Sequence, residues 1–403
     1  MNILPAFLLP IALFALPKVA SADDIHHKPF EFSGYATLGT MQIDRSDSKY
    51  RGSFLPSGGA GDHPFIGTDT VLGLQGRGTI EGSFSYMVQG VTRRWGGGDY
   101  APKITWATLN YEVQPGLLVR VGRTNPAFFM HSDTLFVNYV REWIRPPVEV
   151  YSLSPFVNMD GIDLIYRSAV GPYLVEAQTY LGYSEFSTPY TTLKLTDLVG
   201  ARVLVTAESL SVQVSYANAH MSTRTLPESI APLYAALDRS GFSHIKDEIE
   251  GDDARSRYAS IGIRYESEVA NFSGEYAKRT VSKYFPSAHA WYVSVSRRIG
   301  DFTPYYYYAH HHSDRDPIKS TTGIPAIDKG LYHAAVLKNI AQRSHAIGVR
   351  YELKKGAALK AEVIRSRPDR DSWGIFAPED LSQDKASDGK SINSLGFSLD
   401  VVF

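Results

Sequence analysis

Apolar and polar residues alternate along the last stretch of the chain, 391–403. Apolar residues share one parity and small or polar residues occupy most of the other: Leu395, Phe397, Leu399, Val401 and Phe403 against Ser394, Gly396, Ser398 and Asp400, with Val402 as the exception. Because successive side chains of a strand point to opposite faces, this stretch is predicted to be a strand with one apolar and one polar face.

The same alternation recurs from residue 31 onward in runs of about ten residues, which predict about sixteen strands. The runs are 31–41, 69–78, 83–94, 103–113, 117–123, 162–167, 173–182, 198–207, 210–219, 257–266, 271–281, 289–299, 302–311, 344–353, 358–365 and 391–403. Short turns and long loops alternate between these runs. If the runs are antiparallel strands, all short turns lie at one end of the sheet, and both chain termini lie at that same end. The longest polar breaks, 220–254 and 312–341, are expected to be loops.

A soluble two-sheet sandwich and a membrane-spanning barrel both produce such alternation. The sandwich would bury its apolar face, whereas the barrel would turn that face to lipid and line its lumen with the polar one. An even number of strands, each long enough to cross a membrane when tilted, favours the barrel. We therefore predict an all-β fold, a transmembrane antiparallel β-barrel of about 16 strands, whose width leaves an aqueous interior.

The N-terminal residues predict an export signal. Residues 3–16 are apolar, and Ala20-Ser21-Ala22 fits the small-residue cleavage site of a secretory signal peptide. A membrane anchor is the alternative, but the run is shorter than the roughly 20 residues of a spanning helix. We expect a signal peptide over 1–22 and a single barrel domain over 23–403.

Composition narrows the classes of function. The chain contains no cysteine, which excludes a disulfide framework and thiolate metal sites. Its formal charge of −1 argues against nucleic acid as the main partner. The 25 Tyr and 19 Phe residues suit aromatic girdles at two membrane interfaces.

Over the whole mature chain the sequence resembles the Gram-negative porins, which are sixteen-stranded trimeric barrels. The resemblance lies in the strand pattern, in Phe-Ser-Gly-Tyr-Ala-Thr-Leu-Gly at 32–39, in Val-Arg-Val-Gly-Arg at 119–123 and in the terminal Phe403. It implies an outer-membrane location, lipid and lipopolysaccharide around the barrel, a homotrimer, and recognition of Phe403 by the barrel-assembly machinery. It also implies that the long segment 124–160, after the fifth strand, folds into the lumen as a constriction loop.

The charges of this segment and of the wall suggest how such a constriction would sort solutes. The segment is aromatic and less acidic than in the best-known general porins, and the residues expected at the constriction are Asp133, Arg141, Glu142 and Arg145 from the loop and Arg93, Arg120 and Arg123 from the wall. Arg123 matches the porin phrase, although its parity opposes that of Arg120. Rings of charge set ion selectivity in pores. We expect passive diffusion of small hydrophilic solutes and ions with a slight anion preference.

Three alternatives stay open. One is a channel specific for sugars, small carboxylates or phosphate. An outer-membrane barrel enzyme is less favoured. Such an enzyme needs a nucleophile beside a base, and the sequence contains no Gly-x-Ser-x-Gly motif. His310, His311 and His312 offer imidazoles for a metal. They occur where a strand meets a long loop, and a solvated loop is the favoured interpretation. No catalytic residue, cofactor or metal is expected.

Overall fold

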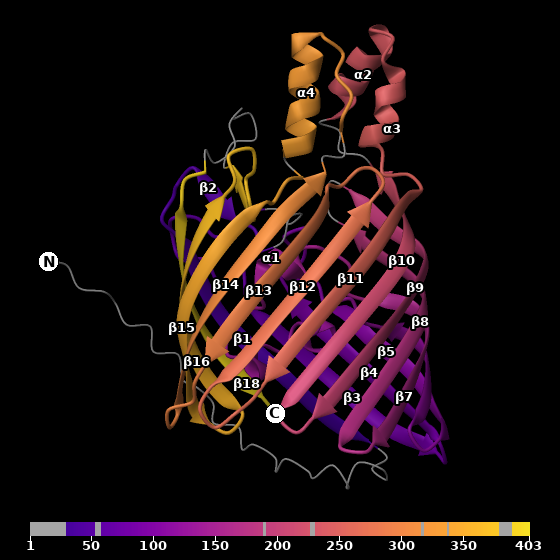
Figure 1. Cartoon of the computed structure of the whole chain (residues 1–403), viewed down its shortest axis with the longest axis vertical. Helices are drawn as coiled ribbons and strands as arrows, with labels where there is room; N and C mark the ends of the chain where they lie inside the picture. The colour runs from indigo at the N-terminus through magenta and orange to yellow at the C-terminus, as the bar shows by residue number, and fades with distance from the viewer. Residues whose placement is uncertain are drawn as a thin grey trace, which may run out of the picture.

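In a computed structural model, the described part of the chain comprises residues 30–52, 58–187, 191–225, 230–315, 318–336, 338–378 and 389–403. The predicted signal peptide, 1–22, lies outside these residues. Sixteen strands of the described part form a closed barrel (Figure 1): β1 (Glu31–Ile43), β3 (Val71–Glu81), β4 (Phe84–Arg93), β5 (Lys103–Gln114), β6 (Leu117–Thr124), β7 (Met159–Val170), β8 (Tyr173–Ser187), β9 (Thr192–Ala207), β10 (Leu210–Thr225), β11 (Ala254–Tyr265), β12 (Asn271–Val281), β13 (Ser287–Ser296), β14 (Phe302–Arg315), β15 (Gln342–Lys354), β16 (Ala357–Pro368) and β18 (Ile392–Val402).

Each strand of the barrel pairs antiparallel with its neighbours in the chain, and β1 closes the circle between β18 and β3. Each of the sixteen predicted runs falls on one of these strands, so the predicted fold class is confirmed. Parity predicted the strands well because each barrel strand has one face toward the lumen and one toward the outside.

The connections of the barrel separate into a short-turn end and a long-loop end. At the short-turn end, Gly116 adopts φ +83° between β5 and β6, and an added Cβ would lie 2.3 Å from the carbonyl oxygen of Arg167. Glycine allows both the positive φ and the close approach. Phe403 lies at the same end, where its backbone exchanges hydrogen bonds of 2.8 and 2.9 Å with Gly34.

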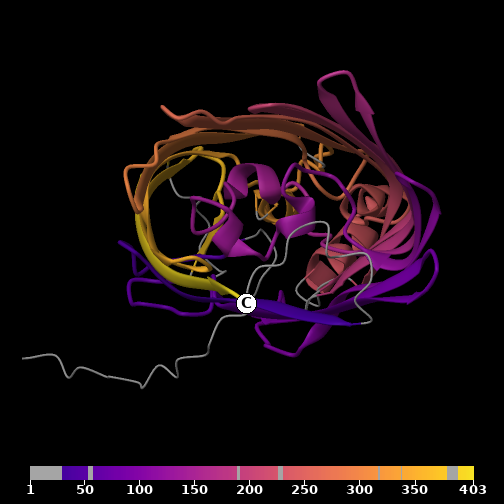
Figure 2. The same cartoon turned by 90° about the horizontal axis from the view of Figure 1, so that it is seen from below.

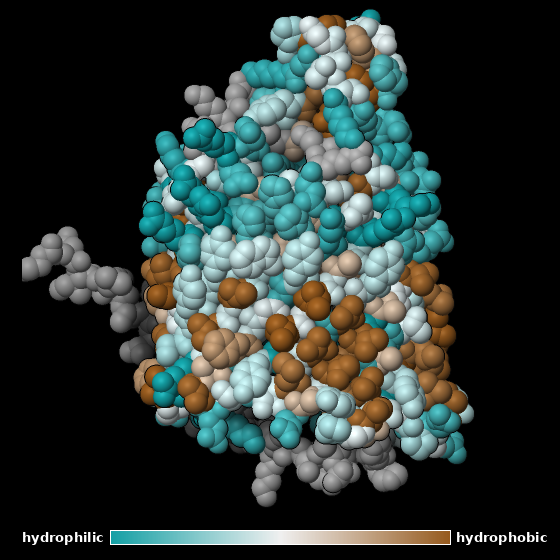
Figure 3. Space-filling view, in the orientation of Figure 1, coloured by the Kyte–Doolittle hydropathy of each residue, from teal (hydrophilic) through white to brown (hydrophobic). Residues whose placement is uncertain are grey.

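The outer wall of the barrel is apolar. Along β11, β13 and β15 the outward residues Ile261, Val293 and Ile347 are 50%, 53% and 65% exposed. Their neighbours in sequence point inward and are buried. On the face seen in Figure 3, apolar residues gather over the short-turn half of the barrel, with hydrophilic residues above them. An apolar outer surface of this kind matches contact with lipid. Among the described residues, no helix has the length and apolar character to cross a membrane.

Short helices rise above the barrel at the long-loop end (Figure 1): α2 (Ala231–Arg239), η5 (Ser243–Ile245), α3 (Lys246–Ile249) and α4 (Pro325–Val336). Leu237, Ile327 and Leu331 belong to one buried apolar cluster between them. The carboxylate of Glu248 accepts hydrogen bonds of 2.7 and 3.2 Å from the backbone N–H groups of Lys319 and Ser320. The two segments expected to be polar loops therefore contain a small packed cap. Beside it, β2 (Ser48–Tyr50) and β17 (Phe376–Pro378) form a two-stranded sheet.

Candidate functional site

The segment between β6 and β7, 125–158, lies inside the barrel; we call it the lumen loop. It contains η2 (Ser132–Thr134), η3 (Asn138–Val140) and α1 (Val148–Tyr151), and the view from below places α1 within the ring of strands (Figure 2). Lys360 of β16 donates hydrogen bonds of 2.7 and 2.8 Å to the backbone oxygens of Asn138 and Trp143. These bonds cross the lumen from loop to wall.

Aromatic side chains hold the lumen loop against the wall. Trp143 is 2% exposed, and its indole N–H donates to the hydroxyl of Ser294 on β13 at 3.0 Å. Its ring meets that of Tyr292 edge to face at 5.4 Å, and Phe128 stacks on Tyr258 at 4.6 Å. Such pairs stabilise packing beyond the apolar area that they bury, and the indole N–H finds the partner that a buried donor requires.

Two buried carboxylates complete the docking of the lumen loop. Glu149 of α1 accepts hydrogen bonds from Ser344 and, at 2.7 Å, from Gln342 of β15. Burial raises the pKa of Glu149, because these two bonds offset the lost hydration only in part. Glu275 of β12 accepts from the backbone N–H of Met130 at 2.8 Å and from the hydroxyl of Tyr151 at 2.9 Å. These bonds tie the loop to β12 and β15.

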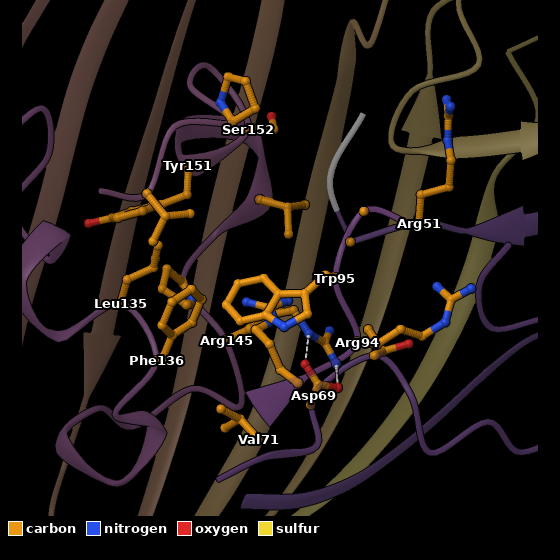
Figure 4. A pocket seen from close by; sticks show the side chains of 18 of the residues that line it. Arg51, Asp69, Val71, Arg94, Trp95, Leu135, Phe136, Arg145, Tyr151 and Ser152 are labelled. Atoms are coloured by element: carbon orange, nitrogen blue, oxygen red, sulfur yellow. Dashed lines mark hydrogen bonds and ion pairs between the residues drawn. The ribbon is translucent and has the colours of Figure 1, made fainter. Parts of the chain in front are cut away.

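On the other side of the lumen loop, toward β3 and β4, lies a cavity of about 180 Å³. Its charged lining is Arg51, Asp69, Arg93, Arg94 and Arg145, and its apolar lining includes Val71, Trp95, Leu135, Phe136, Val148, Val157 and Phe186. Figure 4 shows that lining residues come from the loop before β3 (Asp69), from β3 itself (Val71), from the segment after β4 (Trp95) and from the lumen loop (Phe136 and Arg145). We call this space the arginine cavity.

Arg145 forms an ion pair at the edge of the arginine cavity. Its guanidinium binds Asp69 through two hydrogen bonds of 2.6 and 2.5 Å, drawn as dashed lines in Figure 4. It also lies 3.5 Å from the carboxylate of Glu362 on β16. Burial alone would lower the pKa of Arg145, but Asp69 and the other neighbours together raise it above its ordinary value. Arg145 therefore carries a charge that Asp69 neutralises.

Arg93, at the end of β4, lies against two aromatic rings. The centre of its guanidinium is 4.7 Å from the ring centroid of Phe136 and 5.9 Å from that of Trp95. It makes no hydrogen bond or ion pair with any residue in the described part of the chain. Across the cavity, burial lowers the pKa of Arg51 to about 10, which keeps that guanidinium charged at neutral pH. Arg93 thus adds a positive charge to the cavity that no carboxylate among the described residues pairs with.

Comparison with known proteins found similarity in structure. No protein-family model matches the sequence, and no curated protein matches it. Among solved structures, the chain is similar to an anion-selective porin from Comamonas acidovorans, with a TM-score of 0.57, 12% identity and coverage of 93% of this chain and 99% of that one. It is also similar to Salmonella typhi OmpF in complex with daunomycin, with a TM-score of 0.54, 13% identity and coverage of 93% and 97%. A trimer form of OmpT, an outer membrane protein of Vibrio cholerae, matches with a TM-score of 0.51, 12% identity and coverage of 93% and 99%.

The chain has the porin fold. The identities are too low to carry more than the fold. Within it, the position of the lumen loop between the fifth and sixth strands of the barrel agrees with the position expected for the segment 124–160.

Two of the predicted wall arginines are paired within the porin fold. Arg120 points into the lumen and forms hydrogen bonds of 2.7 and 2.6 Å with Asp163. Arg123 forms an equally close pair with Asp160, at 2.6 Å for both bonds. Arg123 shares the parity of Val121, which is 52% exposed on the outer wall. The structure therefore separates Arg123 from the lumen.

The four loop residues that were expected at the constriction have different environments in the structure. Arg141 donates to the backbone oxygens of Thr134 and Leu135 at 2.7 and 3.0 Å, so it holds the loop's own fold together. Asp133 accepts from Arg202 of β9 at 2.9 Å, and Glu142 lies beside Ser296 of β13 at 3.5 Å. Of the seven residues expected at the constriction, Arg93 and Arg145 line the arginine cavity.

Sequence reasoning missed several residues of the cavity, namely Arg51, Asp69, Arg94 and Trp95. All of them belong to the segments that precede β3 or follow β4, and strand parity says nothing about loops. The sequence Arg93-Arg94-Trp95 was the available signal, because it places two cations beside an aromatic ring at a strand end. The sequence favoured a solvated loop for His310, His311 and His312. For His311 this prediction was wrong, because its side chain is 1% exposed and its Nδ1 lies 2.9 Å from the backbone oxygen of Glu149.

Proposed function

We propose that the chain forms a passive channel for small hydrophilic solutes and ions, with a slight preference for anions, in the outer membrane of a Gram-negative bacterium. The observation that carries the proposal is the arginine cavity beside the lumen loop, inside a barrel with an apolar outer wall. In its lining Arg145 is bound to Asp69, whereas Arg93 has no ion-pair partner among the described residues. Fixed positive charge in a water-filled passage attracts anions.

The lumen loop supplies the narrowing in this proposal. Its hydrogen bonds hold it against β13 and β15, and in this proposal solutes pass beside β3 and β4, where the arginine cavity lies. Arg93 of the wall and Arg145 of the loop would then be the charged residues at the narrowest point. A substrate-specific channel is the second candidate, because apolar side chains share the cavity with the arginines.

Catalysis is not part of the proposal. The residues that line the arginine cavity include no histidine, and the carboxylate among them, Asp69, is bound to Arg145. The lining therefore lacks the base that a nucleophile would need.

Assembly in the outer membrane belongs to the same proposal. A signal peptide at 1–22 would export the chain, the barrel-assembly machinery would read the C-terminal Phe403, and three copies would associate. The solved Vibrio cholerae structure is described as a trimer form, which supports a homotrimer here. Phe403 is suited to recognition because it ends β18, the strand that closes the barrel against β1.

Lipopolysaccharide is the proposed partner of the outer wall above the apolar surface. Outward positions of β11–β16 at the long-loop end carry a band of cations and imidazoles, which we call the basic band: Arg255, Arg257, Lys278, His289, His310, His312, Arg343, His345, Arg365 and Arg367. Arg343 stands directly opposite Arg367 in the ladder. Like charges opposite each other destabilise a sheet. Lipid phosphates would relieve that repulsion.

The proposed channel is tested by recording currents from the purified protein in planar bilayers under a KCl gradient. We expect stepwise conductance and a reversal potential of anion sign. Arg93→Gln should shift this potential toward zero, whereas Arg123→Gln, on the outer wall, should leave it unchanged. Folded protein without any conductance would refute the channel, and a reversal potential of cation sign would refute the anion preference.

A further inference from the structure

We propose that the arginine cavity selects small organic monocarboxylates that carry an apolar body, with Arg93 as the residue that binds the carboxylate. The inference rests on the proposed channel for its physiological meaning, although binding can be measured without transport. Its basis is the combination, in one cavity, of apolar walls with a guanidinium that has no hydrogen-bond or ion-pair partner among the described residues.

The donors of Arg93 are available to a ligand. The ring of Phe136 lies at 4.7 Å from the centre of the guanidinium, and Trp95 lies on the same arginine at 5.9 Å. Aromatic rings hold the planar group without consuming its N–H donors. No hydrogen-bond or ion-pair partner within the described residues occupies those donors. A guanidinium with free edges matches the two oxygens of a carboxylate.

The neighbouring arginine cannot play this part. Arg145 already holds Asp69 through both of its parallel N–H···O bonds, with Glu362 at 3.5 Å. Both oxygens of Asp69 already accept from Arg145, and its side chain is only 4% exposed, so the hydroxyl groups of a sugar have little access to it. This pairing leaves Arg93 as the binding group and makes sugars poor ligands.

The walls of the cavity indicate what the rest of the ligand resembles. Val71, Leu135 and Phe136 face the same space as Arg93, together with Val148, Val157 and Phe186. Arg93 could bind two oxygens of inorganic phosphate, but its other oxygens would lose hydration against these apolar walls. An aromatic or branched aliphatic body would instead bury apolar surface there. The volume of about 180 Å³ is below that of pockets for drug-sized ligands, which suits a single ring or a short chain.

Binding is tested by titration calorimetry on the detergent-solubilised full-length barrel with benzoate, acetate, inorganic phosphate and glucose. We expect benzoate to bind at least about tenfold more tightly than acetate, because its ring adds buried apolar area. Phosphate and glucose should bind more weakly than benzoate. Benzoate should also block KCl current in bilayers over the same concentration range. Equal affinities for benzoate and acetate, or tighter binding of phosphate or glucose, would overturn the inference.

Variants separate the two halves of the ligand. Arg93→Gln should weaken both carboxylates about tenfold or more, because a charge-assisted hydrogen bond is lost. Phe136→Leu should weaken benzoate about fivefold and leave acetate unchanged, since a ring contact is lost while the charge stays. Arg123→Gln, outside the lumen, is the matched control and should change neither. If Arg93→Gln does not fold, Arg93→Lys keeps the charge without the planar fork, and unchanged benzoate affinity in that variant would overturn the role of Arg93.

Failure of the inference differs from failure of the channel. If the barrel conducts KCl but binds benzoate no better than acetate, the proposed channel stands and the proposed carboxylate site is refuted. If it binds benzoate through Arg93 but carries no current, the carboxylate site stands and the channel is refuted.

Discussion

Arg145 and Asp69 join the lumen loop to the wall of the barrel through two parallel hydrogen bonds of 2.6 and 2.5 Å. The arginine belongs to the loop, and the aspartate lies just before β3. Both side chains are less than one-tenth exposed. This pair therefore fixes the loop at the edge of the arginine cavity and decides how much positive charge the cavity presents.

Asp69→Asn should destabilise the barrel and strengthen its anion preference. The change leaves the buried guanidinium of Arg145 with Glu362 alone, and breaking a buried pair costs about 3–5 kcal/mol. Thermal denaturation in detergent measures the first effect and the reversal potential the second. Asp160→Asn removes the partner of Arg123 on the outer wall and should cost less than about 1 kcal/mol. Equal losses in the two variants would contradict this account.

Trp143→Ala should loosen the lumen loop. It removes a buried ring and its hydrogen bond to Ser294, at a cost of about 3–5 kcal/mol. We expect a lower Tm and faster hydrogen exchange of the loop backbone, measured by mass spectrometry. Val140→Ala, at a position of the same loop that is 44% exposed, is the control. Exchange in Trp143→Ala as slow as in this control would show that the wall does not hold the loop.

Glu149 should make the docking of the loop depend on pH. Burial raises the pKa of this carboxyl above its ordinary value of 4.5, so the folded state binds the proton more tightly than the unfolded state. Its contribution to stability is fully present below pH 4.5 and is lost as the pH rises through the raised pKa. Glu149→Gln should remove that part of the decline in Tm with increasing pH. The hypothesis fails if the Tm of both proteins falls by the same amount over that interval.

Phe403→Ala should lower the yield of assembled barrel more than its stability. The backbone hydrogen bonds to Gly34 persist in the variant, and the lost side chain is 40% exposed, so the cost is about 1 kcal/mol. Heat-modifiable mobility in outer-membrane fractions measures the yield. Val401→Ala on the same strand is the control. A yield equal to that of the control would argue against recognition of Phe403.

Replacing Arg343 and Arg367 by serine should reduce the lipopolysaccharide that copurifies with the barrel. The two side chains stand opposite each other in the basic band, so both contacts with a phosphate would be lost. Native mass spectrometry with added lipid A quantifies the effect, and we expect about a tenfold weaker association for two lost ion contacts. Lys194→Ser is the control, because Lys194 pairs in register with Glu185 on the opposite side of the barrel. Equal loss in the control would mean that the band is not the binding surface.

The sequence predicted the barrel because its alternation has a simple cause. Ser260, for example, is buried inside the barrel, whereas Ile261 is 50% exposed on its outer face, and the other strands repeat this alternation. The same reasoning could place Arg120 toward the lumen, but it could not show that Asp163 binds it, since the pairing depends on the register of β6 against β7.

The cavity was less predictable because loops build most of it. Asp69 was assigned to a strand, and nothing near it in sequence points to Arg145, which lies 76 residues away. The helix Pro325–Val336 was missed for another reason. It lies in a segment that is polar overall, and its apolar side chains pack against Leu237 and its neighbours in a different loop. Contacts between distant loops leave no period in the sequence.

The hydrogen bonds of Lys360 to the lumen loop span 222 and 217 residues of chain. Contacts of such long sequence separation form only after much of the chain is ordered. We therefore expect docking of the loop to be a late event in folding, in which the barrel closes first and the segment 125–158 settles into it afterwards.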